Sequence, residues 1–368
     1  MSLTYRRNVQ ILWSSVFAAL LVACGAHRNA DALPGVNPSN PEPLEGIRPQ
    51  SAASLPNKFA NLYVVSLGYV NVNGSVTVYA PGSRRVLRTI TRGLANPGTL
   101  AFDTTGNLYV ANAGKSFSSG SVTVYAPGSS QVLYKISRAI LSPDALALDS
   151  SSNLYVANEH GDTITVYASG SGRFLRKISH GVVAPTALAF DTSGNLYVAN
   201  NNSSSYGTVT VYASNGKLLR TISQGLNLPV SLVFDSSGNL YVANAFENNV
   251  TVYAPGTTKV LRTISQGVIA PYAVLFDRSG NLNVANSQGN PGVGSVTVYA
   301  HGKPKLLRTI LKGVNSPDSL AFDGSGNLYV VNDVFGAGSV TVYAAGKAKL
   351  LRTISQGITT PSDLAFGP

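Results

Sequence analysis

The sequence predicts an all-β protein, a seven-bladed β-propeller made of four-stranded blades. Three observations lead to this fold: one unit recurs seven times, each unit contains four short runs of strand-forming residues, and turn-forming residues separate the runs. Four strands in a period of 40–50 residues are typical of a propeller blade. Charged residues make up only 12% of the chain and Gly occurs 36 times, which argues against a helical bundle or a coiled coil.

The first strand motif to stand out is Asn-Leu-Tyr-Val. It begins at Asn61, Asn107, Asn153, Asn195, Asn239, Asn281 and Asn327, and Asn283 replaces its Tyr in the sixth copy. The spacings are 46, 46, 42, 44, 42 and 46 residues. Motifs of the types Val-Thr-Val-Tyr-Ala, Val-Leu-Arg-Thr-Ile and Pro-x-x-Leu-Ala-Phe-Asp follow in each unit. Val, Ile, Tyr and Thr favour strands, and the Gly, Pro, Asn and Asp between the motifs favour turns.

The repeat also resembles a known group of propellers. The strings Leu-Ala-Phe-Asp, Gly-Asn-Leu-Tyr-Val-Ala-Asn and Val-Thr-Val-Tyr-Ala look like NHL-repeat and related YVTN-type propellers over residues 57–368. The resemblance implies the fold and is unspecific for activity. WD40 propellers are less similar, because the chain contains no Trp-Asp dipeptide.

The order of the motifs predicts how the ring closes. The unit that begins at Asn61 lacks a preceding Leu-Ala-Phe strand, whereas a spare one, Leu364-Ala365-Phe366, follows the last unit. We therefore expect the strand within residues 360–368 to lie innermost in the first blade and to complete it. A ring of six or eight blades would require a different count of units.

The N-terminal region is typical of an exported protein. Arg6 and Arg7 precede an apolar stretch that is too short to span a membrane easily, as in a signal peptide over residues 1–23. The tetrad Leu21-Val22-Ala23-Cys24 resembles the lipobox of bacterial lipoproteins, which implies cleavage before Cys24 and a lipid on this single cysteine. An ordinary signal peptide cut after Ala32 is the alternative.

This region also predicts where the protein resides. The Pro-rich segment 24–56 has no apolar period, so we expect an extended tether. The lipidated protein would reside in the bacterial cell envelope. Gly25 occupies the position where Asp would indicate retention in the inner membrane, so the outer membrane is favoured, facing the periplasm or the cell surface.

Two sets of repeated polar residues are candidate binding groups. An Asp follows the Leu-Ala-Phe strand at Asp103, Asp149, Asp191, Asp235, Asp277 and Asp323, with Gly367 in the seventh place. One carboxylate per loop is too few for calcium, so these residues are expected to cap turns. An Asn ends the second strand at Asn112, Asn158, Asn200, Asn244, Asn286 and Asn332. These residues either make polar contacts within the blade or form a ligand-binding ring, in which Asn158 and Asn332 lie beside candidate acids.

The unrepeated acids are the more specific candidates. Asp144 with Glu159 and Asp318 with Asp333 form two pairs of matching layout. Asp363 lies one place further along its strand than Asp144 and Asp318 do along theirs. Gluconolactonase-like propellers hold a divalent metal at the channel mouth, so this resemblance implies calcium or magnesium as the ligand of these acids. The other interpretation is solvated loop acids. No trio of histidines converges, so the His-acid-metal cluster of virginiamycin B lyases cannot be assigned.

The net charge is +11, and many of the positively charged residues lie on one strand of the repeat. The fourth strand carries Arg88, Lys135, Arg176, Lys177, Arg220, Arg262, Arg308 and Arg352. Charge on an outermost strand discourages edge-to-edge aggregation; attraction to acidic envelope polymers or lipid head groups is the alternative.

These patterns favour a non-catalytic binding or scaffolding lipoprotein. A metal-dependent lactonase or lyase is the alternative. We expect a monomer without an organic cofactor, held at the membrane by its lipid, with a protein or an acidic polysaccharide as partner. Nucleic acid is not expected, because an exported chain without interleaved exposed aromatic residues lacks the usual stacking groups.

Overall fold

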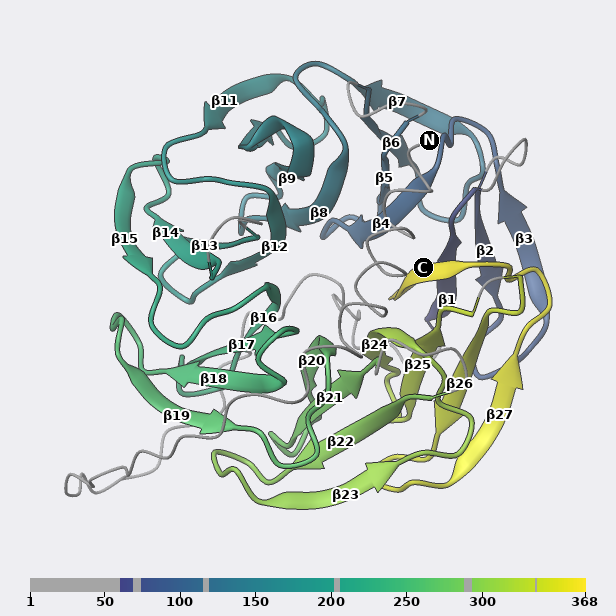
Figure 1. The fold of residues 1–368 in the computed structure, drawn as a ribbon. Helices are drawn as coiled ribbons and strands as arrows, with labels where there is room; N and C mark the ends of the chain where they lie inside the picture. The colour runs from purple at the N-terminus through teal and green to yellow at the C-terminus, as the bar shows by residue number, and fades with distance from the viewer. Residues whose placement is uncertain (1–59, 69–73, 115–118, 202–205, 288–292, 335) are drawn as a thin grey trace.

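The computed structural model describes residues 60–68, 74–114, 119–201, 206–287, 293–334 and 336–368. They form seven four-stranded antiparallel sheets arranged as blades around a ring (Figure 1), so the chain is a seven-bladed β-propeller. The predicted blade number and strand count are confirmed. The predicted signal peptide, Cys24 and the predicted tether lie outside the described residues.

The blades follow one another along the chain, and each runs from an innermost to an outermost strand. Blade 1 contains, in this order, β28 (Pro361–Gly367), β1 (Asn61–Ser66), β2 (Ser75–Tyr79) and β3 (Val86–Ile90). Blade 2 contains β4 (Pro97–Phe102), β5 (Leu108–Asn112), β6 (Ser121–Tyr125) and β7 (Val132–Ile136). Blade 3 contains β8 (Pro143–Leu148), β9 (Leu154–Asn158), β10 (Thr163–Tyr167) and β11 (Phe174–Ile178). Blade 4 contains β12 (Pro185–Phe190), β13 (Leu196–Asn200), β14 (Thr208–Tyr212) and β15 (Leu218–Ile222).

The remaining three blades repeat this arrangement. Blade 5 contains β16 (Pro229–Phe234), β17 (Leu240–Asn244), β18 (Asn249–Tyr253) and β19 (Val260–Ile264). Blade 6 contains β20 (Pro271–Phe276), β21 (Leu282–Asn286), β22 (Ser295–Tyr299) and β23 (Leu306–Ile310). Blade 7 contains β24 (Pro317–Phe322), β25 (Leu328–Asn332), β26 (Ser339–Tyr343) and β27 (Leu350–Ile354).

Blade 1 closes the ring by joining the two ends of the described chain. Strand β28 pairs antiparallel with β1, with Asn61 opposite Gly367 and Leu62 opposite Phe366. Figure 1 shows the yellow β28 beside the purple β1. The prediction that residues 360–368 supply the innermost strand of the first blade is confirmed. No turn links these two strands, whereas a short turn links the corresponding strands of every other blade.

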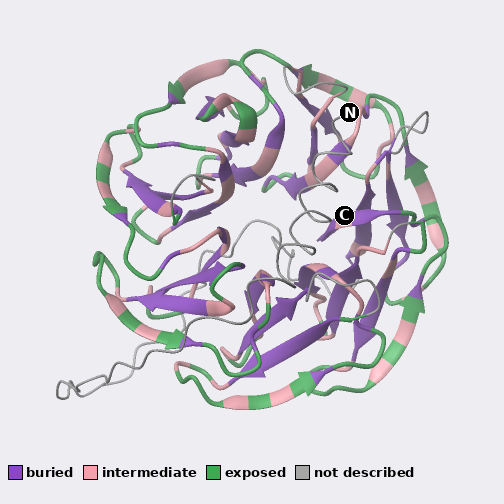
Figure 2. Ribbon diagram, in the orientation of Figure 1, coloured by how far each residue is buried: buried purple, intermediate pink, exposed green. Residues whose placement is uncertain are grey.

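The core lies between neighbouring blades. The second strand of most blades is buried along its whole length, as in β5 and β9, because both of its faces meet another sheet. The fourth strand alternates between exposed and half-buried residues, which gives the outer rim of Figure 2 its green and pink bands. Aromatic pairs join the blades; the Tyr155 and Phe190 rings meet edge to face with centroids 5.0 Å apart.

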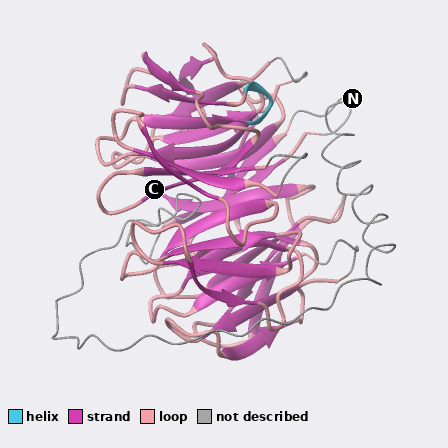
Figure 3. Ribbon diagram, turned by 60° about the vertical axis from the view of Figure 1, so that its left-hand side comes forward, coloured by secondary structure: helices cyan, strands magenta, loops and turns pink. Residues whose placement is uncertain are grey.

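The two faces of the ring differ in their connections. One face, which we call the turn face, carries the turns between first and second strands and between third and fourth strands. The opposite face, the variable-loop face, carries the loops between second and third strands and the connections to the next blade. The one short helix among the described residues, η2 (Glu159–Gly161), lies on the variable-loop face, and β28 ends on the turn face (Figure 3). None of the helices in the described part of the chain is long and apolar enough to cross a membrane.

Candidate functional site

The predicted acid pairs lie on the variable-loop face, at the ends of inner strands. Asp144 is the second residue of β8, and Glu159 follows β9 directly. Pro143 pairs with Asn158, so the two acids flank one strand pair. Asp318 and Asp333 flank the Pro317–Asn332 pair of blade 7 in the same way. All four acids are half-buried, and the two pairs occupy equivalent positions in their blades.

The ring keeps the two acid pairs in separate blades. Blades 4, 5 and 6 separate them on one side of the ring, and blades 1 and 2 on the other. Within the described residues, no group of three or more His, Cys, Asp or Glu side chains is placed to hold a metal ion. Glu159 contacts its neighbour in the chain, with Oε2 lying 3.5 Å from Nδ1 of His160. The structure therefore arranges these acids as pairs.

The Asn residues that end the second strands hold the incoming loop against the blade. Asn158 is fully buried; its Oδ1 accepts a hydrogen bond from the Leu141 N–H at 3.0 Å, and its Nδ2 donates to Thr165 Oγ1 at 3.0 Å. Asn332 does the same, accepting from Asn315 N at 2.9 Å and donating to Thr341 Oγ1 at 3.1 Å. The same loop contact recurs in the other described copies of this Asn. Both polar atoms of these amides are engaged inside the blade, as in the first interpretation.

Asp363 occupies the interface that closes the ring. It is 5% exposed, and its carboxylate accepts hydrogen bonds from groups on both neighbouring blades. Thr99 Oγ1 donates to Oδ2 at 2.8 Å and Leu100 N at 3.2 Å, while Ser319 Oγ donates to Oδ1 at 2.9 Å. Burial raises the pKa of Asp363, although these hydrogen bonds and one from the Leu364 N–H offset part of the rise. Blades 7, 1 and 2 are thus joined through one carboxylate.

The repeated Asp residues cap turns, as predicted. Asp103 Oδ1 accepts from the N–H groups of Thr105 and Asn107, both at 2.9 Å, and Oδ2 accepts from the Asn107 amide at 2.8 Å. Burial alone would raise the pKa of Asp103, but the hydrogen bonds from Thr105 and Asn107 outweigh it and lower the pKa below its usual value. Gly367 takes the seventh place because a Cβ there would lie 2.3 Å from the Phe102 ring.

The fourth-strand arginines belong to a polar chain that the sequence motifs did not reveal. Arg352 Nη2 donates to the Tyr329 hydroxyl at 2.9 Å, and that hydroxyl lies 3.4 Å from Asp323 Oδ2. In blade 1, Arg88 donates to Tyr63 at 2.7 Å, and Tyr63 donates to the Pro368 carbonyl at 2.5 Å. The recurrence of Arg, Tyr and Asp in the repeat is the sequence signal from which this polar chain could have been predicted.

The alternation of side chains along the fourth strand explains which residues are exposed on the outer rim. Arg residues at the middle of the fourth strand are half-buried along the blade, so the adjacent leucines point outward. The exposed leucines of the fourth strands are Leu87, Leu133, Leu219, Leu261, Leu307 and Leu351. Arg88 and Arg352 are half-buried and donate hydrogen bonds to Tyr hydroxyls, while Lys135 and Lys177 are exposed. That the charge of the fourth strand discourages edge-to-edge aggregation stays a prediction.

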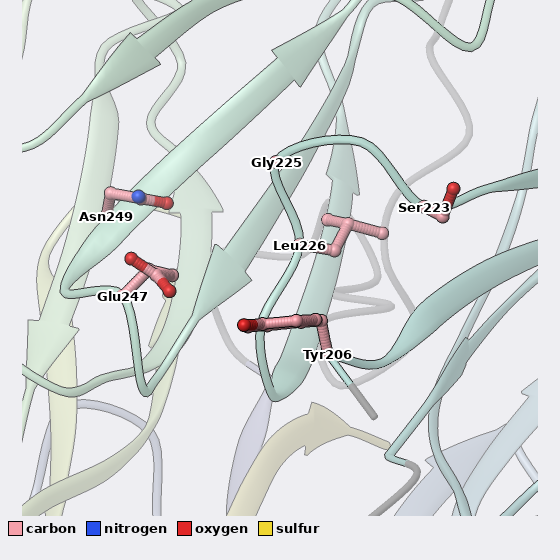
Figure 4. A pocket seen from close by; sticks show the side chains of 6 residues that line it. All are labelled: Tyr206, Ser223, Gly225, Leu226, Glu247 and Asn249. Atoms are coloured by element: carbon pink, nitrogen blue, oxygen red, sulfur yellow. The ribbon is translucent and has the colours of Figure 1, made fainter. Parts of the chain in front are cut away.

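An open depression lies on the variable-loop face between blades 4 and 5. Its volume is about 330 Å³, and Tyr206, Ser223, Gly225, Leu226, Glu247 and Asn249 line it (Figure 4). Tyr206 is 72% exposed, and Glu247 Oε1 accepts a hydrogen bond from Asn227 Nδ2 at 2.8 Å. An exposed aromatic ring beside a carboxylate and an amide offers both stacking and hydrogen bonding. The sequence motifs do not single out this place, because Tyr206 and Glu247 come from loops that differ between the repeats, while Ser223 and Gly225 belong to a Ser-Gln-Gly segment that recurs elsewhere in the chain.

Comparisons with known proteins show the fold alone. No family model matches the chain, and no curated protein matches it. Among solved structures, a functionally unknown protein from Desulfotomaculum acetoxidans has a TM-score of 0.65 and 14% identity, over 84% of this chain and 99% of its own. The computationally designed Ika8 protein has a TM-score of 0.59 and 17% identity, over 86% of this chain and 93% of its own. The chain therefore shares the β-propeller fold with these structures.

Proposed function

We propose that the protein is a non-catalytic binding or scaffolding propeller of the bacterial cell envelope, similar to NHL-type propellers and anchored by a lipid on Cys24. The proposal rests on one observation: repeated polar residues lie inside the blades, and unrepeated ones lie on the variable-loop face. Repeated Asp, Asn, Tyr and Arg side chains make hydrogen bonds inside the blades. Unrepeated residues gather on the variable-loop face, where a binding surface can differ from blade to blade without disturbing the scaffold.

The depression between blades 4 and 5 is the part of this face best suited to contact a partner. Its exposed Tyr206 supplies a rigid amphipathic ring, and Glu247 supplies an acceptor. A protein is the proposed partner of this depression, because Glu247 and the other acids of the variable-loop face would repel an acidic polysaccharide. The lipid anchor is supported by the Leu21-Val22-Ala23-Cys24 tetrad at the end of an apolar segment.

Capture from envelope extract tests the binding role. Immobilised wild-type protein should retain a partner that the Tyr206→Ala/Glu247→Ala variant loses. The matched control is Tyr134→Ala/Lys217→Ala, which removes an aromatic ring and a charge away from this depression and should retain the partner. A partner retained equally by both variants would refute the assignment to this face.

Incorporation of labelled palmitate tests the anchor. Label should enter the wild-type protein in cells, and Cys24→Ser should abolish both the label and extraction with the membrane fraction. A Cys24→Ser protein that still fractionates with membranes as wild type does would contradict the anchor.

A further inference from the structure

Exposed cations on the turn face concentrate in three consecutive blades. Blades 6, 7 and 1 each place two exposed bases in the turn between third and fourth strands, and blade 6 adds one between its first and second strands. We call this set the basic sector; it consists of Arg84, Arg85, Arg278, Lys303, Lys305, Lys347 and Lys349. The turns follow β2, β22 and β26, so they lie next to one another along the outer rim of Figure 1.

Few acids oppose the basic sector. The turn face of these blades carries Asp277 and Asp323, so seven bases minus two acids leave +5. Both carboxylates already accept hydrogen bonds within their own turns. Blade 1 has no acid at this place, because Gly367 stands where the other blades have Asp.

The other described turns and loops lack this excess of positive charge, whereas the fourth strand of every blade carries at least one base. The described turn face of blades 2–5 has three exposed turn bases, Arg173, Lys217 and Lys259, against four acids, which gives −1. On the variable-loop face, the described loops and the strand residues beside them carry six exposed or half-buried acids against three bases, which gives −3. These six acids are Asp144, Glu159, Asp162, Glu247, Asp318 and Asp333; the bases are Arg92, Arg138 and Lys312. The charge is therefore directional: positive at one sector of the turn face and negative on the opposite face.

The chain enters the propeller within this same sector. Strand β1 begins at Asn61, opposite Gly367, which places the start of the described chain on the turn face of blade 1. Residues 1–59 precede that point. A lipid on Cys24 would be attached 60 − 24 = 36 residues before Ala60. The proposed lipid would therefore be joined to the propeller at the turn face of blade 1, next to the basic sector.

We propose that the basic sector docks the propeller on an anionic lipid bilayer, with its lysines and arginines against phosphate head groups and the variable-loop face turned away. This inference rests on the proposed lipid anchor, which brings the correct face to the membrane. Basic side chains near an anionic bilayer each strengthen binding by about five-fold. The acids of the variable-loop face are repelled by the same surface, which fixes the orientation.

Vesicle co-sedimentation with two charge-matched variants tests the docking. The full chain carrying Cys24→Ser is used throughout, so the apolar N-terminal segment is common to all proteins. The first variant is Lys305→Glu/Lys347→Glu/Lys349→Glu, in the basic sector. The control is Arg173→Glu/Lys217→Glu/Lys259→Glu, which makes the same charge change at exposed turns between the same strands of blades 3, 4 and 5. Circular dichroism melts establish that both variants fold.

The expected result is a difference between the two variants on anionic vesicles. On phosphatidylglycerol vesicles the basic-sector variant should bind at least about 100-fold more weakly than the parent, since three lysines each contribute about five-fold. The control should lose less than about ten-fold, because Arg173, Lys217 and Lys259 lie in blades 3, 4 and 5, outside the basic sector. Neither variant should differ from the parent on phosphatidylcholine vesicles. Equal losses in both variants would overturn the proposal, because net charge alone would then explain binding.

A soluble competitor separates the membrane from a free polymer. Polyphosphate at matched phosphate concentration should compete weakly with vesicles; binding to polyphosphate alone would overturn the bilayer as the partner. Labelling of Cys24 keeps this test separate from the proposed function. If labelled palmitate enters the protein but the basic sector does not bind vesicles, the anchor is supported and the docking is refuted. If no palmitate enters but the protein binds vesicles through the basic sector, the docking is supported and the anchor is refuted.

Discussion

Substitution of Phe366 by Ala tests whether β28 is the part of the ring that opens first. Phe366 is 3% exposed, and its ring meets Tyr329 edge to face with centroids 4.9 Å apart. Loss of a buried Phe side chain costs about 3–5 kcal/mol, a large share of a typical stability of about 5–15 kcal/mol. For a domain of about 300 residues, 4 kcal/mol lowers the Tm by about 6 °C.

Phe190→Ala is the matched control for this prediction. Phe190 makes the equivalent contact with Tyr155, with centroids 5.0 Å apart, and is 7% exposed. Its strand is joined to β13 by the turn at residues 191–195, whereas β28 and β1 have no such link. Both variants should therefore melt at similarly lowered temperatures. Only Phe366→Ala should release its inner strand without unfolding the other blades.

Native-state hydrogen exchange followed by mass spectrometry measures that release. A loss of about 3 kcal/mol or more should lower the protection of β28 and β1 amides by about 100-fold or more in Phe366→Ala. In Phe190→Ala, exchange of β12 should follow that of its whole blade. Equal protection of β28 and β12 in the two variants would refute the idea that the strand without a linking turn is the weak point of the ring.

Three further predictions follow from the polar and aromatic contacts. Asn283→Tyr should raise stability by about 0.5–2 kcal/mol in denaturant unfolding, because it restores the ring that five of the other copies pair with a Phe; a lowered midpoint would contradict this. The pKa of Asp363 is raised in the folded state, so its contribution to folding stability is fully present below its unfolded pKa of about 4 and is lost as the pH rises through the folded pKa. The difference in unfolding free energy between wild type and Asp363→Asn should therefore favour wild type more at low pH. A difference that does not change with pH would refute this linkage. Millimolar calcium or magnesium should leave the Tm unchanged if the protein is a non-catalytic binder, whereas a marked rise that Asp318→Ala/Asp333→Ala abolishes would favour the metal-dependent alternative.

The sequence predicted most of the fold because the repeat encodes it directly. Each of the four strand motifs occurs seven times, so a departure in one copy, such as Asn283, does not obscure the pattern. Ring closure could also be predicted, since Leu364-Ala365-Phe366 is a strand motif that follows the last unit and belongs to no unit of its own. Turn caps at the Asp residues followed from local geometry, which depends only on residues up to four positions away.

Contacts between blades could not be predicted from the sequence. Asp363 lies one place further from its Pro than Asp318 does, but the sequence alone does not show that Thr99 and Ser319 from the neighbouring blades surround it. The hydrogen bonds from fourth-strand arginines to Tyr hydroxyls were not predicted, although the alternation of Leu and Arg along the strand placed the two residue types on opposite sides. The depression beside Tyr206 depends on loops from two blades, so its geometry exists only in the assembled ring.

The closing strand sets the order in which the protein can be completed during synthesis. Asn61 pairs with Gly367, which is 367 − 61 = 306 residues later. Blades 2–7 can form in sequence as the ribosome delivers them, because each draws on neighbouring residues alone. The three strands made first must wait with an open inner edge until the last strand arrives, which makes this edge the place where a nascent chain is most exposed to aggregation and to chaperones.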